Sequence, residues 1–152
     1  AQNGNLDAQY QLGQNILSGK GCKVEKQKGI DWIVYAADKG HPKAARKAYH
    51  LLTKSQHLNN TKLAPEHWLK QAADQGDPES QLEYAHFLAF NGNKTDKVQI
   101  ENYLEQYLKV RDKSVKYHQV RAQLYRIEKN EKKAQKELKK ANKLAKKLGW
   151  EV

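Results

Sequence analysis

The sequence WIVYAADKG at residues 32–40 returns 36 residues later as WLKQAADQG at residues 68–76. The tryptophan, the two alanines, the aspartate and the glycine are identical in the two stretches. Matches of this kind at one fixed spacing are typical of proteins built from stacked repeats, so a 36-residue repeat is the starting point for the fold. The same offset pairs Ala8 with Ala44, Pro42 with Pro78, His50 with His86 and Leu52 with Leu88.

Each repeat is predicted to be a pair of helices. Residues 6–17 carry apolar or small side chains at intervals of three and four, which is the spacing of one helix face. A second helix is expected over residues 26–39 and ends at Gly40, because glycine adopts the left-handed conformation that closes many helices. Pro42 suits the first turn of the next helix, and Asp77 is the expected N-cap at the equivalent junction. The pattern predicts an all-α protein made of antiparallel helix pairs.

Small side chains at fixed positions predict where neighbouring helices approach closely. A bulkier residue at such a position would hold the two backbones apart, whereas Trp32 and Trp68 are expected to fill the larger gap one turn earlier. A single helix pair cannot bury its apolar face alone, so we expect neighbouring pairs to stack into a continuous core. The small residues are Gly13, Ala36, Ala37, Ala72 and Ala73.

The repeat register weakens after residue 92. We expect a helix from a cap at Thr95 or Asp96 to about residue 110, followed by a last pair over residues 114–128 and 130–148. In the final helix one apolar stripe faces the array and lysine occupies most other positions, as the polar outer face of a terminal repeat requires. The stripe consists of Ala134, Leu138, Ala141, Ala145 and Leu148.

The motifs can now be compared with known repeats. The first repeat carries Leu12-Gly13 after Ala8, then Gly19-x-Gly21, and then Trp32-x-x-x-Ala36-Ala37-x-x-Gly40. These motifs resemble the Sel-one-like repeat, a 36-residue relative of the tetratricopeptide repeat. The second repeat has Ala48-Tyr49 in place of Leu-Gly and lacks the Gly-x-Gly loop. It keeps Ala44, Trp68, Ala72, Ala73 and Gly76.

The resemblance implies a right-handed α-solenoid of about four helix pairs that serves as a protein-binding scaffold. It implies a role in bacterial signalling or cell-envelope assembly, and no active site. We therefore predict one solenoid domain over residues 1–152. Within it, residues 5–91 carry the repeats, residues 95–128 form degenerate helices, and residues 130–148 form a basic capping helix.

The charge of the chain lies at one end. The 152 residues carry a formal net charge of +11, from 28 basic and 17 acidic side chains. Residues 1–108 hold 13 basic and 12 acidic side chains, a net charge of +1, whereas residues 109–152 hold 15 and 5, a net charge of +10. A nearly neutral body with a basic end indicates a local contact with an acidic partner.

Residues that would carry catalysis do not form a recognisable pattern. No nucleophile and base stand at a known spacing, and the glycine-rich residues 13–21 depart from a phosphate-binding loop in both spacing and context. The histidines lack metal-ligand spacing, and Cys22, the single cysteine, cannot form an internal disulfide. We expect no enzymatic activity, no cofactor and no metal.

The compartment is less well defined by the sequence. The longest apolar run is six residues, at positions 32–37, far short of the roughly 20 that cross a bilayer. The chain contains no methionine, so we expect the natural start upstream of Ala1. The bacterial periplasm or cell envelope is favoured over the cytoplasm, and a monomer is expected.

The first helix of each pair is expected to line a concave groove that binds another protein. Arginine, histidine and aromatic side chains supply planar donors for carboxylates and apolar anchors. For the role of His50 and His86 three hypotheses stay open. The two histidines are a repeated polar surface position, a shared groove contact, or part of a metal site that would need further ligands. The predicted groove residues are Tyr10, Gln14, Lys43, Arg46, His50, His86, Phe90, Lys116, Gln123 and Arg126.

The lysines of the last helix offer an alternative binding surface. They either keep a capping helix in solution or attract an anionic partner: an acidic protein, an anionic membrane surface or, less favoured, nucleic acid. No aromatic residue is interleaved among them to stack on bases. The predicted anionic-partner patch comprises Lys132, Lys136, Lys139, Lys140, Lys143 and Lys147.

Overall fold

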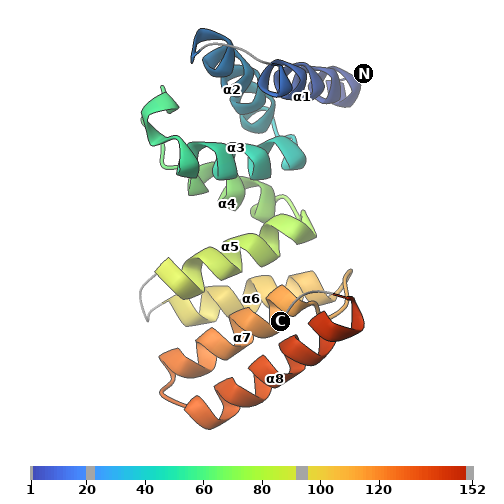
Figure 1. The fold of residues 1–152 in the computed structure, drawn as a ribbon, viewed down its shortest axis with the longest axis vertical. Helices are drawn as coiled ribbons and strands as arrows, with labels where there is room; N and C mark the ends of the chain where they lie inside the picture. The colour runs from blue at the N-terminus through green and yellow to red at the C-terminus, as the bar shows by residue number, and fades with distance from the viewer. Residues whose placement is uncertain (1, 20–22, 92–95, 150–152) are drawn as a thin grey trace. The chain divides into compact units, whose positions relative to one another are not determined.

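The computed structural model describes residues 2–19, 23–91 and 96–149, and helices are the only regular elements in these residues. This confirms the all-α prediction. Gly21, Cys22 and Thr95, which the sequence singled out, lie outside the described residues. The helices are α1 (Gln2–Ser18), α2 (Lys23–Asp38), α3 (Pro42–Lys54), the 3-10 turn η1 (Gln56–Leu58), α4 (Glu66–Asp74), α5 (Pro78–Asn91), α6 (Lys97–Leu108), α7 (Val115–Ile127) and α8 (Glu131–Lys147) (Figure 1).

The chain divides into two compact units, residues 1–80 and residues 81–152. In the first unit α1 packs on α2, α2 on α3, and α3 on α4. Its core joins side chains from α2, α3, η1 and α4, with Ile30, Leu52 and Trp68 among the most deeply buried. In the second unit α7 packs on α8, and Val115, Ala141 and Ala145 form a small core between them.

The helix ends follow the predicted capping chemistry. Gly40 and Gly76 have φ values of 102° and 101°, in the left-handed region that glycine tolerates best. Around each of them the backbone makes the paired 6→1 and 5→2 hydrogen bonds of the Schellman motif. His41 and Asp77 then cap the next helices, each with a side chain that accepts a backbone N–H. The two junctions are therefore repeats of one local structure.

The last helix pair has the same junction without glycine. Lys129 N–H bonds to the Arg126 carbonyl and Asn130 N–H bonds to the Tyr125 carbonyl, in the same Schellman pattern. Lys129 has a φ of 60° and is the one non-glycine residue with positive φ among the described residues. Asn130 caps α8 through its side-chain oxygen, and Ser114 caps α7 through its hydroxyl.

Aromatic contacts connect α5, α6 and α7 in the second unit. The Tyr84 ring meets the Tyr103 ring edge to face, with 5.4 Å between centroids, and Tyr107 stacks on Tyr117 at 6.5 Å. Gln81 Nε2 on α5 also donates to Gln106 Oε1 on α6, at 3.1 Å. The sequence did not indicate these contacts, because they join positions outside the repeat register.

The predicted burial of two side chains, those of Trp32 and Leu148, is wrong. Trp68 is 1% exposed, but Trp32, which occupies the same register position, is 37% exposed. Trp68 lies in the core with side chains of α2, whereas no helix of the described chain precedes α1 to cover Trp32 in the same way. Leu148, expected in the buried stripe of the last helix, is 55% exposed because it is the C-cap residue beyond the final turn of α8.

Gly13 confirms the prediction of a close helix approach. A Cβ atom on Gly13 would lie 2.7 Å from Ile33 Cγ1 and 2.8 Å from the Gly29 carbonyl oxygen, both on α2. Gly29 lies opposite, and a Cβ there would meet the Gly13 carbonyl oxygen at 3.0 Å. The two glycines therefore set how closely α1 and α2 can pack.

We predict that Gly13→Ala lowers the free energy of unfolding by about 2 kcal/mol, because the added methyl forces the α1 and α2 backbones apart. Gly4→Ala on the same helix is the matched control, since a Cβ there meets nothing within 4 Å. Urea denaturation followed by circular dichroism measures both variants. Equal stability of the two would contradict close packing at Gly13.

Candidate functional site

Tyr10 and Arg46 are equivalent residues of the predicted groove, 36 positions apart, and each contacts the N-cap that follows the next junction. The Tyr10 ring lies 5.0 Å from the His41 ring, centroid to centroid. Arg46 Nη1 lies 2.5 Å from Asp77 Oδ2, and about a fifth of each side chain is exposed. These two groove residues therefore link successive helix pairs, and the positive charge of Arg46 already has a carboxylate partner.

His41 and Asp7 form a pair that resembles part of a catalytic dyad. His41 Nδ1 accepts the Ala44 backbone N–H at 3.0 Å, so the ring proton sits on Nε2, which donates to Asp7 Oδ1. Both ring nitrogens are thereby used: Nδ1 caps α3 and Nε2 binds Asp7 on α1. Among the described residues, the adjacent pocket of about 340 Å³ is lined by Leu6, Asp7, Gly40, His41, Pro42 and Lys43.

Of the other groove residues of the first unit, Lys43 and His50 are more accessible. Lys43 and His50 are exposed on α3, and the His50 ring lies edge-on to that of Tyr49. Gln14 is half-buried and lines a pocket of about 410 Å³ that Lys43 does not border. Lys47, one turn after Lys43 on α3, lines this pocket with Gln14.

The structure brings three predicted groove residues together in the second unit. The His86 ring lies 4.5 Å from the ring of Phe90, which is 46% exposed. Lys116 Nζ on α7 lies 3.8 Å from Glu83 Oε1, and its positive charge is close enough to His86 to disfavour protonation of the imidazole. Burial lowers the pKa of His86, and the positive charge of Lys116 lowers it further against the smaller opposing effect of Glu83. Near neutral pH this site, which we call the His86 cluster, joins a neutral imidazole, an exposed aromatic ring and a cation.

The last two groove residues lie on α7. Gln123 is half-buried, and Arg126 is exposed with its Nε 3.4 Å from Glu131 Oε2 at the start of α8. His50 belongs to the first unit and His86 to the second, so their predicted alignment on one face stays a prediction.

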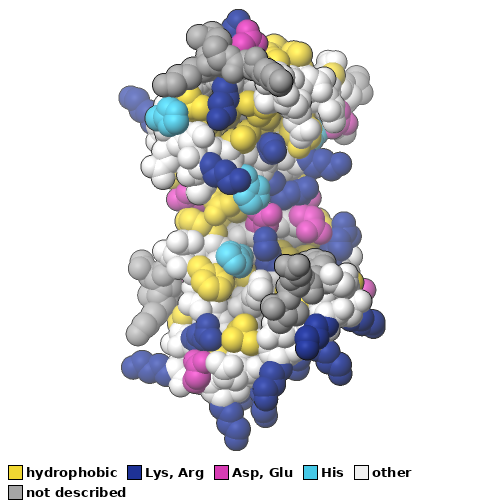
Figure 2. Space-filling model, viewed as in Figure 1, with side chains coloured by type: hydrophobic (Ala, Val, Ile, Leu, Met, Phe, Trp, Pro, Cys, Tyr) yellow, Lys and Arg dark blue, Asp and Glu magenta, His cyan; other side chains and the backbone are white. Residues whose placement is uncertain are grey.

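The lysines of the predicted anionic-partner patch are all exposed on α8. Figure 2 shows lysine and arginine side chains gathered around this helix, in dark blue at the lower end of the view. Lys140 Nζ lies 3.3 Å from Glu137 Oε1. Within the described part of the chain this is the ion pair that a patch lysine makes. Lys146 and Lys147 lie in the last turn of α8, where the helix dipole favours positive charge.

Two side-chain clusters were missed by sequence reasoning. His118 Nδ1 lies 2.8 Å from Glu137 Oε2, which joins α7 to α8 in a largely buried pair. The Tyr125 ring lies between two cations, with Arg121 Cζ at 5.1 Å and Lys133 Nζ at 5.7 Å from its centroid. The contacts of Glu137 and Lys133 join α8 to α7 and have no signal in the sequence, whereas Arg121 and Tyr125 stand four residues apart on α7, a spacing that sequence reasoning could have used.

Within the described residues no group of three or more His, Cys, Asp or Glu side chains could hold a metal ion. The helices in those same ranges are too short or too polar to span a bilayer. Comparison of the chain with family models, with curated proteins and with solved structures found no match.

The His118–Glu137 pair predicts an acid-sensitive contribution to stability. Burial acts to raise the pKa of Glu137, but hydrogen bonds from His118 and Lys140 outweigh it and hold the pKa below its ordinary value of 4.5. A carboxyl group with a lowered pKa in the folded state stabilises the fold above its unfolded pKa. That stabilisation is lost as the pH falls through the folded value.

We therefore predict that Glu137→Gln lowers the free energy of unfolding by about 1 kcal/mol at neutral pH. The difference from the parent chain should shrink as the pH falls below about 4.5, because the parent loses the same interaction. Urea unfolding at a series of pH values measures this. Glu105→Gln, at an exposed position on α6, is the control, and a pH-independent difference for Glu137→Gln would count against the pair.

Proposed function

We propose that the chain is a right-handed α-solenoid of 36-residue repeats that serves as a non-enzymatic scaffold for another protein. The repeated junctions support this proposal. Gly40 and Gly76 end helices with the same backbone geometry, and the contacts Tyr10–His41 and Arg46–Asp77 recur at the same register. Repeats of this kind stack by nearest-neighbour contacts and present an extended surface. The bacterial setting, the compartment and the monomeric state that the sequence favours stay predictions.

The observation that carries the binding role is the His86 cluster. Phe90 presents nearly half of its surface beside the imidazole of His86, and Lys116 adds a cation from the next first helix, α7. An exposed aromatic side chain is a common anchor at protein interfaces, where burial of its ring supplies much of the binding energy. A cation beside the anchor selects partners with a carboxylate near the apolar residue. We infer that the partner presents an apolar side chain flanked by aspartate or glutamate.

The test is a selection of peptides from a random library against the whole chain. Peptides with an aromatic or aliphatic residue next to an acidic one should be enriched. Phe90→Ala should weaken their binding about tenfold or more, because a lost anchor at an interface centre costs roughly 1.4 kcal/mol or more. Fluorescence anisotropy of a labelled peptide measures the affinity.

Val98→Ala is the matched control, because Val98 on α6 is also an exposed apolar residue. Both variants should unfold at nearly the parent temperature, since each truncates an exposed side chain. Equal weakening by Val98→Ala and Phe90→Ala, or a selection that enriches no motif, would overturn the binding role of the His86 cluster.

The exposed lysines of α8 favour a second candidate function, electrostatic binding of an anionic partner. Six exposed lysines lie on one helix, and among the described residues one of them, Lys140, pairs with a carboxylate, that of Glu137. The helix therefore carries a strong local positive charge. Such charge attracts acidic proteins, anionic membrane surfaces and nucleic acid through the same salt-sensitive interaction. The three partners differ in how their negative charges are arranged, so a comparison of the affinities for each of them shows which one the chain prefers.

We predict that replacing the six patch lysines with glutamine abolishes most binding to polyglutamate, phosphatidylserine vesicles or duplex DNA, whichever the parent binds. The parent should show a steep decline of log affinity with log salt, and the variant a shallow one. The matched control removes six exposed lysines of the first unit and should keep the parent slope. A salt-independent affinity would rule out this second function. The control positions are Lys26, Lys28, Lys39, Lys47, Lys54 and Lys62.

A further inference from the structure

The second helix pair has a face that the preceding pair covers. Ala44, Ala45 and Ala48 on α3 are fully buried, and so is Trp68 on α4. They lie in one cluster with Ile30, Ile33, Ala36 and Ala37 of α2. Packing of a second helix onto the pair that follows it therefore buries these four register positions.

Three of the same register positions of the first pair are exposed, and the fourth, Gln9, is half-buried. They are Ala8, Gln9 and Leu12 on α1 and Trp32 on α2, each 36 residues before its buried counterpart. Ala8 is exposed, Leu12 is 43% exposed and Trp32 is 37% exposed. At Ala8 and Trp32 the residue type is the same as in the second pair, so the difference in exposure at these two positions follows from the helix that lies ahead of the second pair.

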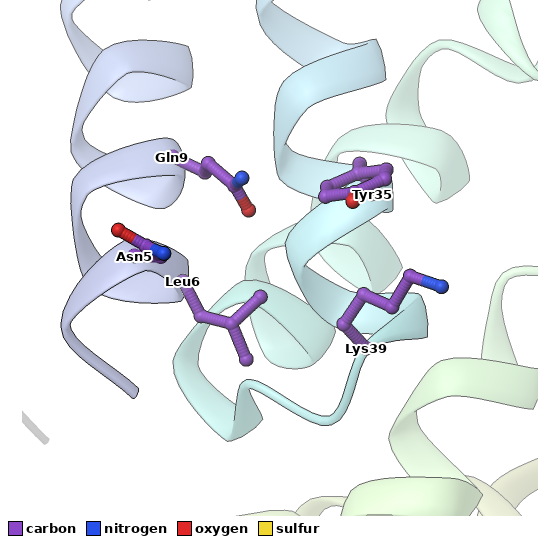
Figure 3. A pocket seen from close by; sticks show the side chains of 5 residues that line it. All are labelled: Asn5, Leu6, Gln9, Tyr35 and Lys39. Carbon is purple, nitrogen blue, oxygen red and sulfur yellow. The ribbon is translucent and has the colours of Figure 1, made fainter. Parts of the chain in front are cut away.

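Side chains next to these positions form an open surface in which aromatic rings lie beside polar and charged groups, among them Lys28 and Asp31. Tyr35 on α2 is 46% exposed, and its ring meets the Trp32 ring edge to face at 6.3 Å. Tyr35 and Gln9 line two pockets of about 310 and 560 Å³, of which the smaller is shown in Figure 3. Two exposed aromatic rings and an exposed leucine in one helix pair are typical of a surface that another element covers.

Gln9 supplies an independent polar indication. Its Oε1 atom is buried and has no hydrogen-bond partner, and Figure 3 shows the side chain reaching from α1 toward α2. A buried carbonyl oxygen without a hydrogen-bond donor destabilises the fold, so a donor from a docked element would stabilise this face.

We propose that this face, formed by Ala8, Gln9, Leu12, Trp32 and Tyr35, is the docking site for a further helix pair of the same repeat, stacked ahead of α1. The docked helix has the chemistry of α2, which presents branched and small apolar side chains to α3. It differs in two respects that the face requires. Opposite Leu12, which replaces Ala48, it has a smaller residue, and near Gln9, which replaces Ala45, it has a side-chain N–H donor. The proposal rests on the repeat register and not on the binding role of the His86 cluster.

The experiment adds a further helix pair to the whole chain. A copy of residues 5–40 is inserted directly before Asn5, so that Gly40 of the copy precedes Asn5 as it precedes His41 in the parent. Fluorotryptophan labelling and fluorine NMR report the solvent exposure of each tryptophan, and Trp32→Phe in each copy assigns the signals. A second version carries Gln9→Ala and Leu12→Ala in the inner copy, which makes α1 match the three alanines of α3.

The inner Trp32 should become as protected from solvent as Trp68, while the outer copy stays exposed. The thermal midpoint should rise by roughly 5 °C or more, because each stacked repeat adds interface energy. Leu12→Lys is the control for the interface. It should change the parent midpoint little, and should lower the midpoint of the extended protein and expose the inner Trp32 again.

Continued exposure of the inner Trp32 in both extended versions would overturn the proposal. Concentration-dependent protection of Trp32 in the 152-residue chain, with a dimer mass by sedimentation, would also overturn it and assign the face to a second copy. Loss of peptide binding after Phe90→Ala does not bear on this outcome, so the two proposals fail separately.

Discussion

The left-handed glycine at the end of a helix is the constraint on which the rest of the first unit depends. At Gly40 and again at Gly76 the backbone reverses within two residues and closes the preceding helix with two hydrogen bonds. The next residue is already the N-cap of the following helix. No loop residue separates the glycine from the next N-cap. The junction therefore fixes where each new helix begins relative to the helix before it.

Side chains from the preceding pair then secure each junction. Tyr10 and Arg46, one repeat apart, contact the caps His41 and Asp77 by different chemistry, an aromatic contact in one case and an ion pair in the other. The position is therefore conserved within the chain in its role and not in its residue type. This explains why comparing the two repeats letter by letter underestimates their structural equivalence.

Much of the fold followed from local chemistry that the sequence displays. Gly40, Asp77 and Gly13 were predictable because turn geometry, capping and close approach each restrict the residue type. Trp32 was mispredicted because its burial depends on a neighbouring element and not on its own register position. The His118–Glu137 pair was not predictable either, since it depends on how α7 and α8 pack. For the candidate site, the groove prediction identified His86, Phe90 and Lys116 but not the engagement of Arg46 with Asp77, which only the arrangement of α3 and the next cap reveals.

The junction between α7 and α8 uses lysine where the earlier junctions use glycine. A side chain at Lys129, with its φ of 60°, crowds the following carbonyl and costs about 1 kcal/mol relative to an unstrained residue. That strain is relieved whenever the final hairpin opens, whereas opening at Gly40 or Gly76 relieves none. The most positively charged helix therefore follows a strained junction, and opening that junction releases strain that opening at a glycine junction does not.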